Sequence, residues 1–150
     1  MAHIRFLGSG FDKTTGEAWV KKSSPYGVFT GWANCSNEDL DIQSEFIGCS
    51  IAEYRADVQI ANARRKWLRQ RYEGIKNLNN TILNNWDSRM LEANNKGHYE
   101  VSNMFMDMRI QEDEAKKLSD KAWIEWKEMV ESEWLVIDNL LYRKRKYQDK

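Results

Sequence analysis

The feature that most constrains the fold is a row of inward-type residues that repeats every four and three positions between Ile47 and Ile75. This spacing is typical of a helix that packs along a partner helix. The row comprises Ile47, Ile51, Tyr54, Val58, Ala61, Arg65, Leu68, Tyr72 and Ile75. The sequence therefore predicts a long helix over residues 44–77, in which Gly48 would allow a backbone or a sheet to approach closely.

A second long helix is predicted over residues 102–147. Its apolar side carries Phe105, Met108, Ala115, Leu118, Ala122, Trp126, Met129, Val136 and Leu140, and a flanking row adds Trp123, Val130, Trp134, Ile137 and Leu141. This face is too wide for one helix and a small sheet to cover. We therefore expect a homo-oligomer with Trp123, Trp126 or Trp134 in the interface, although these rings and Trp86 could instead form a stacking box.

The two helices differ in charge. Residues 53–76 carry seven basic and three acidic side chains, whereas residues 107–138 carry ten acidic and five basic ones. Opposite charges favour side-by-side packing of the two helices, within one chain or between two. The basic run Arg64–Arg71 includes Trp67 and would also suit phosphates and a base, but a solvated helix face that answers the acidic helix is the simpler interpretation.

The first 35 residues read as a small antiparallel sheet with strands at 3–7, 17–22 and 26–35. Gly8-Ser9-Gly10, 12–16 and Ser23-Ser24-Pro25 have the chemistry of turns. In the third strand, alternation places Val28, Thr30 and Trp32 on one face, and Phe29, Gly31 and Ala33 on the other.

Residues 78–100 are expected to be irregular with one short helix, because asparagine favours turns over helix interiors. Ser44 would cap the start of the first helix. The predicted fold class is α+β in a single domain, with a small N-terminal antiparallel sheet packed on a long antiparallel helical hairpin.

Several function classes lack support in the sequence. The formal net charge of zero provides no general field for nucleic acid, and no run of about 18 apolar residues could span a membrane. His3 and His98 are far apart, so no metal site is visible. Cys35 and Cys49 are too few for a disulfide framework, which favours a reduced cytosolic setting. Without a P-loop, nucleophile elbow or histidine-based acid–base pair, we expect no enzyme and no cofactor.

Candidate ligand-binding residues gather at the start of the second helix. Free N–H groups there suit an anion, while an aromatic ring and a guanidinium provide a stacking plate and a phosphate fork. The set comprises Asn103, Phe105 and Arg109, with Trp86, Arg89 and Tyr99 nearby in sequence. Arg5 or Lys21 of a neighbouring sheet could close the pocket. A position for Phe105 in the core is the alternative.

Arg65 is the one charged residue of the inward row. A buried guanidinium requires a carboxylate or phosphate partner. Both an acid on the other helix and a ligand remain open.

One stretch resembles a known group of proteins. The residues are Gly31, Ala33, Cys35, Asp39, Ile47-Gly48, Ile51-Ala52 and Arg55-Ala56. Over residues 31–56 the chain resembles small phage proteins of Gram-positive hosts that include a Thoeris anti-defence family. The resemblance implies a sheet with a helical hairpin, an oligomer, and a sponge that binds a cyclic ADP-ribose-type or other cyclic nucleotide signal in the cytoplasm of the infected host. A phage factor that binds a host or defence protein directly, or a structural virion component, remains open.

Overall fold

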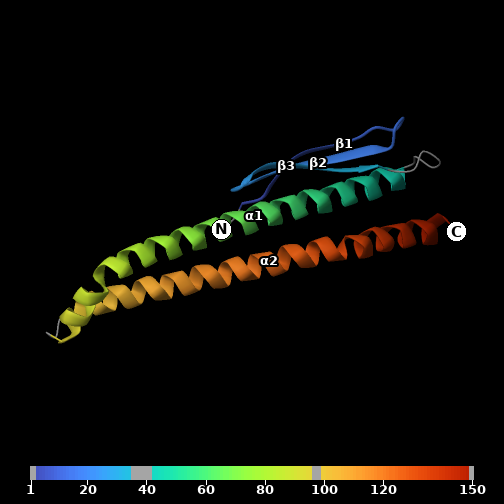
Figure 1. Cartoon of the computed structure of the whole chain (residues 1–150). Helices are drawn as coiled ribbons and strands as arrows, with labels where there is room; N and C mark the ends of the chain where they lie inside the picture. The colour runs from blue at the N-terminus through green and yellow to red at the C-terminus, as the bar shows by residue number, and fades with distance from the viewer. Residues whose placement is uncertain (1–2, 35–41, 96–98, 149–150) are drawn as a thin grey trace. The chain divides into compact units, whose positions relative to one another are not determined.

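The computed structural model describes residues 3–34, 42–95 and 99–148. An antiparallel sheet with strand order β1-β2-β3 is followed by two long helices (Figure 1). The elements are β1 (Arg5–Phe11), β2 (Glu17–Ser24), β3 (Gly27–Asn34), α1 (Ile42–Asn95) and α2 (Tyr99–Gln148). This confirms the predicted α+β class. Two compact units are distinguished: residues 1–64 with 124–150, and residues 65–123.

In the first unit, β3 lies directly against the backbone of α1. A Cβ atom on Gly31 would overlap the carbonyl oxygen of Ala52 and would lie 2.5 Å from the nitrogen of Ala56. Ala33, Ala52 and Ala56 are buried around this contact. Only glycine fits such an approach without displacing one backbone from the other. Several residues that carry the family resemblance are therefore packing residues of this sheet–helix junction.

The core of the first unit joins the sheet to both helices. Val20 and Ala33 pack with Ile47, Ile51 and Ala52, and Ile137 and Leu140 of α2 pack against this cluster. Two ion pairs link the helices: Arg55 Nε lies 2.8 Å from Glu133 Oε1, and Arg64 Nη1 lies 3.2 Å from Glu125 Oε2. The predicted pairing of a basic with an acidic helix is confirmed within one chain.

In the second unit, α1 and α2 bury Leu68, Leu83, Phe105, Ala115 and Ala122. The inward row predicted from spacing is confirmed along α1, because all nine of its residues from Ile47 to Ile75 are buried or half-buried.

The first strand differs from the prediction. The sequence predicts a turn at Gly8-Ser9-Gly10, but β1 continues to Phe11 and pairs with β2. The reason is the register, because Gly10 lies opposite Trp19 and the indole covers the strand where it has no side chains. The turn predicted at 12–16 is confirmed by a 2.8 Å hydrogen bond from Gly16 N to Asp12 O.

The ends of α1 also differ. The helix begins at Ile42, so Ser44 lies inside it rather than at its cap, and it continues to Asn95 through the segment that was expected to be irregular. Asn79 is buried, and its Nδ2 donates a 2.9 Å hydrogen bond to the carbonyl oxygen of Met108 on α2. Tertiary bonding of this kind outweighs the weak helix propensity of asparagine. The second helix begins at Tyr99, three residues before the predicted start.

Candidate functional site

Two of the residues predicted to bind a ligand at the start of the second helix already have partners within the chain. Phe105 is only 8% exposed, as the core alternative expects, so its ring is not the free plate that stacking requires. Arg109 Nη1 lies 3.4 Å from both Asn80 Oδ1 and Glu112 Oε1. Its guanidinium therefore already has acceptors on α1 and α2.

Of the remaining residues predicted near this point, the structure describes the side chain of Asn103. Asn103 is exposed on α2, and because that helix begins at Tyr99, Asn103 lies beyond its first four N–H groups. The side chains of Trp86, Arg89 and Tyr99 lie outside the described residues.

Arg65 is half-buried on α1, and Arg5 is exposed on β1. For the predicted interface, Trp134 is 64% exposed, Trp123 is also exposed, and Trp126 is half-buried. Association through these three rings stays a prediction.

The strongest candidate site is the outer face of the sheet, which is the face away from α1. Gly10, Trp19 and Trp32 lie side by side in one row across the three strands. A Cβ atom on Gly10 would overlap Trp19 Nε1, and one on Gly8 would lie 3.6 Å from Trp19 Cη2. The indole of Trp19 therefore lies across β1, directly over Gly8 and Gly10. This places a flat aromatic surface on top of the sheet.

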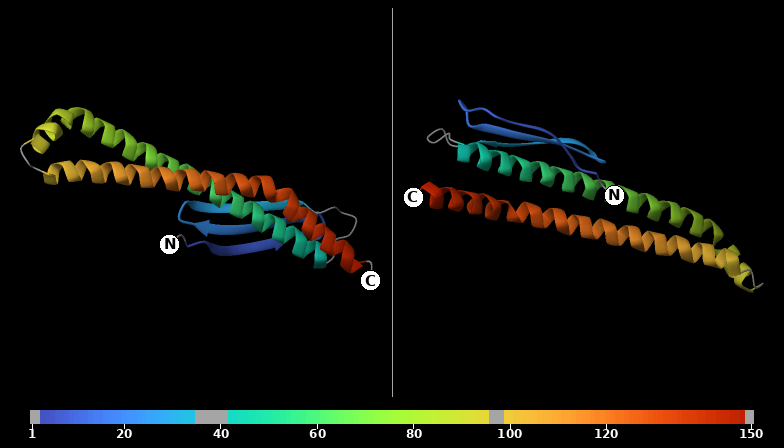
Figure 2. Two further views of the ribbon diagram at one scale, coloured as in Figure 1. Left: turned by 90° about the horizontal axis from the view of Figure 1, so that it is seen from below. Right: turned by 180° about the vertical axis from the view of Figure 1, so that it is seen from behind.

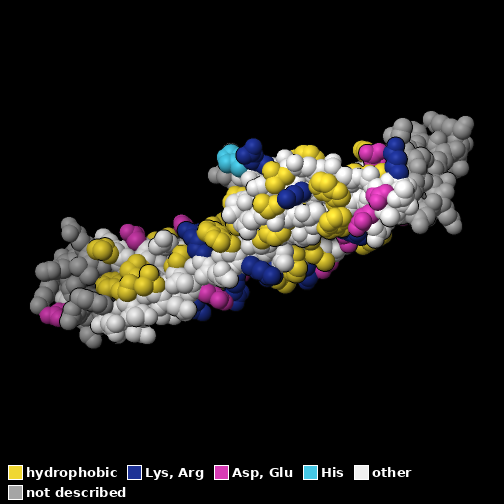
Figure 3. Space-filling model, turned by 90° about the horizontal axis from the view of Figure 1, so that it is seen from above, with side chains coloured by type: hydrophobic (Ala, Val, Ile, Leu, Met, Phe, Trp, Pro, Cys, Tyr) yellow, Lys and Arg dark blue, Asp and Glu magenta, His cyan; other side chains and the backbone are white. Residues whose placement is uncertain are grey.

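Charged and aromatic side chains surround this surface. Trp32 is 50% exposed beside Trp19. Lys21 pairs with Gly8 and Thr30 in the next row of the same face, and Arg5 pairs with Ser23 one row further. Figure 3 shows hydrophobic side chains gathered with Lys and Arg over the sheet. Lys21 and Arg5 thus lie towards one end of the outer face.

The opposite end of this face is acidic. A hollow of about 560 Å³ is lined by Asp12, Lys13, Glu17, Trp19 and Trp32, with Gly10 and Phe11 completing it. Asp12 Oδ1 accepts a 2.8 Å hydrogen bond from Thr14 N and another from Thr14 Oγ1. These hydrogen bonds lower the pKa of the Asp12 carboxyl below its usual value. Asp12 therefore carries a full negative charge at neutral pH.

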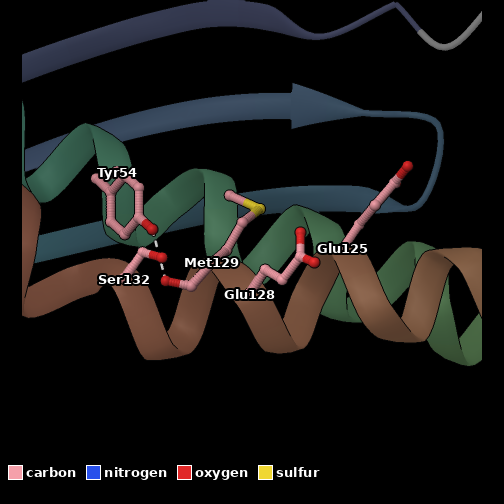
Figure 4. Close-up of a pocket in the computed structure, with 5 residues that line it drawn as sticks. All are labelled: Tyr54, Glu125, Glu128, Met129 and Ser132. Carbon is pink, nitrogen blue, oxygen red and sulfur yellow. Dashed lines mark hydrogen bonds between the residues drawn. The ribbon is translucent and has the colours of Figure 1, made fainter.

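A second cavity, of about 400 Å³, lies between α1 and α2 in the first unit (Figure 4). It is lined by Tyr54, Glu125, Glu128, Met129 and Ser132. The Tyr54 hydroxyl donates a 2.5 Å hydrogen bond to the carbonyl oxygen of Met129, and burial together with Glu133 raises the pKa of Tyr54. With two carboxylates and no cation in its lining, this cavity suits a nucleotide poorly.

The inner face of the sheet carries a buried cation. Lys22 Nζ lies 2.9 Å from Glu53 Oε1 and 2.8 Å from Asp57 Oδ1, both on α1. Burial lowers the pKa of Lys22, but its hydrogen bonds to Asp57 and Glu53 outweigh this and leave the pKa raised. Lys22 therefore stays protonated and ties β2 to α1.

The sequence analysis did not predict the contact of Trp19 with Gly8 and Gly10. The pattern Gly8-x-Gly10 in one strand and Trp19 in the next was visible, but their contact depends on the register between the strands.

Among the described residues, no group of three or more His, Cys, Asp or Glu could hold a metal ion. Within the same part of the chain, no helix is long and apolar enough to cross a membrane. No protein-family model, no curated protein and no solved structure matches the chain.

Proposed function

We propose that the protein is a non-catalytic phage anti-defence protein that binds and sequesters a cyclic nucleotide immune signal on the outer face of its sheet. It would act in the cytoplasm of the infected bacterial host. The observation that carries this proposal is the indole of Trp19 lying across Gly8 and Gly10, with Trp32 beside it. A base that stacks on such a ring gains about 1–3 kcal/mol.

The cations of the same face support a phosphate-bearing ligand. Lys21 lies two residues from Trp19 along β2, about 7 Å away at the usual rise of a strand. Arg5 lies one row beyond Lys21. A base over Trp19 and a phosphate near Lys21 would therefore use stacking and charge together, and holding a signal requires no acid–base chemistry.

Isothermal titration calorimetry tests the proposal with cyclic ADP-ribose isomers and cyclic dinucleotides. We expect Trp19→Ala and Lys21→Ala each to weaken binding about tenfold or more, because they remove the stacking ring and a charged partner. Trp67→Ala is the matched control, since Trp67 is as exposed as Trp32 but lies on α1. It should leave the affinity unchanged.

The proposal fails if none of these nucleotides binds the wild-type protein at about millimolar concentration. It also fails if Trp67→Ala weakens binding as much as Trp19→Ala, because the sheet face would then have no special role.

A second candidate is direct binding to a host or defence protein. The observation that favours it is a row of exposed apolar residues on α2, in which Val130, Trp134 and Leu141 are spaced by four and seven residues. If this row binds a protein, Trp134→Ser should abolish that complex and leave nucleotide calorimetry unchanged. The reverse result would favour the nucleotide.

A further inference from the structure

The two edge strands of the sheet, β1 and β3, differ in how their backbone groups are covered. On β3, Arg55 Nη1 donates a 2.8 Å hydrogen bond to the carbonyl oxygen of Trp32, and Gln59 Nε2 donates a 3.0 Å hydrogen bond to that of Thr30. Side chains of α1 thus occupy two of the acceptors along this edge. Such covering prevents another strand from pairing there.

The opposite edge is formed by β1, which borders the sheet in the left view of Figure 2. Its apolar side chains are exposed, with Phe6 at 60% and Leu7 at 48%. Residues 6–11 contain no charged residue and no proline. These are the features that allow an edge strand to pair with another chain.

We propose that β1 pairs antiparallel with β1 of a second copy about a two-fold axis at Ser9, so that Arg5 of each copy enters the Asp12 hollow of the other. Residues directly opposite each other in a sheet share a face. Gly8 and Gly10 lie on the outer face, opposite Lys21 and Trp19. An axis at Ser9 pairs Gly8 of one copy with Gly10 of the other, and the faces match.

A register shift in β1, between Phe6 and Gly8, determines which residues would pair beyond Gly8. Phe6 pairs with Lys22 and Gly8 pairs with Lys21, so Leu7 is the extra residue. If Leu7 has no opposite residue in the new pairing either, Phe6 opposes Phe11 of the second copy, with both on the inner face. Arg5 then opposes Asp12, with both on the outer face. The strand is thus complementary to itself in shape and in charge, as a two-fold interface requires.

The hollow has the chemistry to receive an arginine. Two carboxylates and two indoles line it against a single lysine. Carboxylates bind guanidinium groups in a bidentate manner, and indole faces attract them. Thr14 donates two hydrogen bonds to Asp12 Oδ1, whereas a carboxylate can accept about four. Arg5 of the second copy would therefore supply the charge that this hollow lacks.

Pairing would also join the two sheets into one of six strands, with two Trp19 surfaces on a continuous outer face. The use of both surfaces by one ligand rests on the proposed function, whereas the pairing itself does not.

Sedimentation analysis of charge variants tests the pairing. Wild-type protein should sediment at twice its 17.8 kDa chain mass. Ser9→Lys and Ser9→Asp place like charges opposite each other at the axis, so each alone should raise the dimer Kd at least tenfold. An equimolar mixture should restore a heterodimer. Ser9→Thr is the control and should remain dimeric, and circular dichroism checks that each variant folds.

The role of Arg5 is tested with Arg5→Ala, which should raise the dimer Kd at least tenfold. Arg71→Ala, which removes an exposed arginine from α1, should not.

A wild-type monomer at about 50 micromolar overturns the proposal. So does a dimer that tolerates Ser9→Lys but dissociates with Trp134→Ser, which places the interface on α2. Ser9 variants that stay monomeric when mixed overturn the two-fold register, and nucleotide calorimetry can succeed or fail independently of all three outcomes.

Discussion

The two faces of the sheet reverse the usual distribution of side-chain size. The inner face, against α1, carries small residues such as Ala18, Gly31 and Ala33. The outer face carries Trp19 and Trp32, the second of which is 50% exposed. Large aromatic rings normally contribute most when they are buried. The reversal indicates that the inner face is built for close approach of the helix backbone and that the outer face is available for binding.

The two faces should therefore respond oppositely to mutation. Contacts between closely packed atoms are weak individually but numerous, so an added methyl group should be more harmful inside than the loss of a whole ring outside. Five predictions follow.

The largest effect is expected for Gly31→Ala. The new methyl group would overlap the Ala52 carbonyl oxygen, which is backbone and cannot rotate away. Overpacking of this kind costs about 1–3 kcal/mol or more, and we expect a loss of about 3 kcal/mol in the free energy of unfolding in urea. Gly74→Ala is the control, because nothing lies within 4 Å of its added methyl group; it should stabilise the helix by about 0.5–1 kcal/mol. Equal effects at the two glycines would contradict the close approach.

The next effect is expected for Lys22→Met, which removes the ion pairs of the buried Lys22 ammonium to the solvent-accessible carboxylates of Glu53 and Asp57. Hydrogen bonds to charged groups contribute about 1.5–3 kcal/mol, so urea unfolding should show a loss in that range. Lys21→Met, on the exposed outer face, should change stability by less than about 0.5 kcal/mol.

The same pair gives a pH test. The raised pKa of Lys22 means that its contribution is present below the unfolded value of 10.5 and is lost as pH rises through the higher folded value. Wild-type stability should therefore fall towards that of Lys22→Met above about pH 10.5. A constant difference between the two proteins up to pH 12 would show that the ion pairs are not its source.

A smaller effect is expected for Trp32→Ala. Half of this ring stays in water in the folded state, so its removal should cost less per carbon atom than Val20→Ala on the inner face, which should cost about 1.5–2 kcal/mol for two buried carbon groups. Thermal or urea unfolding of both variants decides the order. A larger loss per carbon atom for Trp32→Ala would mean that the outer ring is part of the core.

The smallest effect concerns Asp12 in the turn at the end of the outer face. Its lowered pKa means that its contribution is present above the unfolded value near 3.8 and is lost as pH falls through the lower folded value. The Asp12 carboxyl followed by NMR should titrate below 3.8, and Thr14→Ala, which removes the hydroxyl donor, should move its midpoint upwards. A midpoint unaffected by Thr14→Ala would show that the hydroxyl does not contribute.

Much of the architecture could be predicted, because it follows from local patterns of spacing, alternation and charge in the sequence. The four-and-three spacing from Ile47 to Ile75 predicted one buried side of α1, and all nine positions are buried or half-buried. Alternation in residues 28–33 predicted the two faces of β3 correctly, since Gly31 and Ala33 are buried while Val28 and Trp32 are exposed. The opposite charges of the helices predicted their pairing.

The errors share a cause. Asn79 was interpreted from its propensity for turns, but its side chain bonds to Met108 across the hairpin. Gly8 and Gly10 were interpreted as turn residues, but Trp19 covers them. Both partners lie on another strand or helix. For Phe105 the sequence left a stacking plate and the core open, and its burial agrees with the core alternative.

By itself, the sequence determined which sides of the strands and helices are apolar, because side-chain direction follows the periods of strand and helix. It also determined the charge of each helix. Only the tertiary structure decided the contacts between elements: Trp19 on Gly10, the Ala52 carbonyl against Gly31, and Lys22 between Glu53 and Asp57. The physical reason is that a local period places a residue on a face, whereas its partner on that face depends on strand register and helix depth, which long-range packing sets.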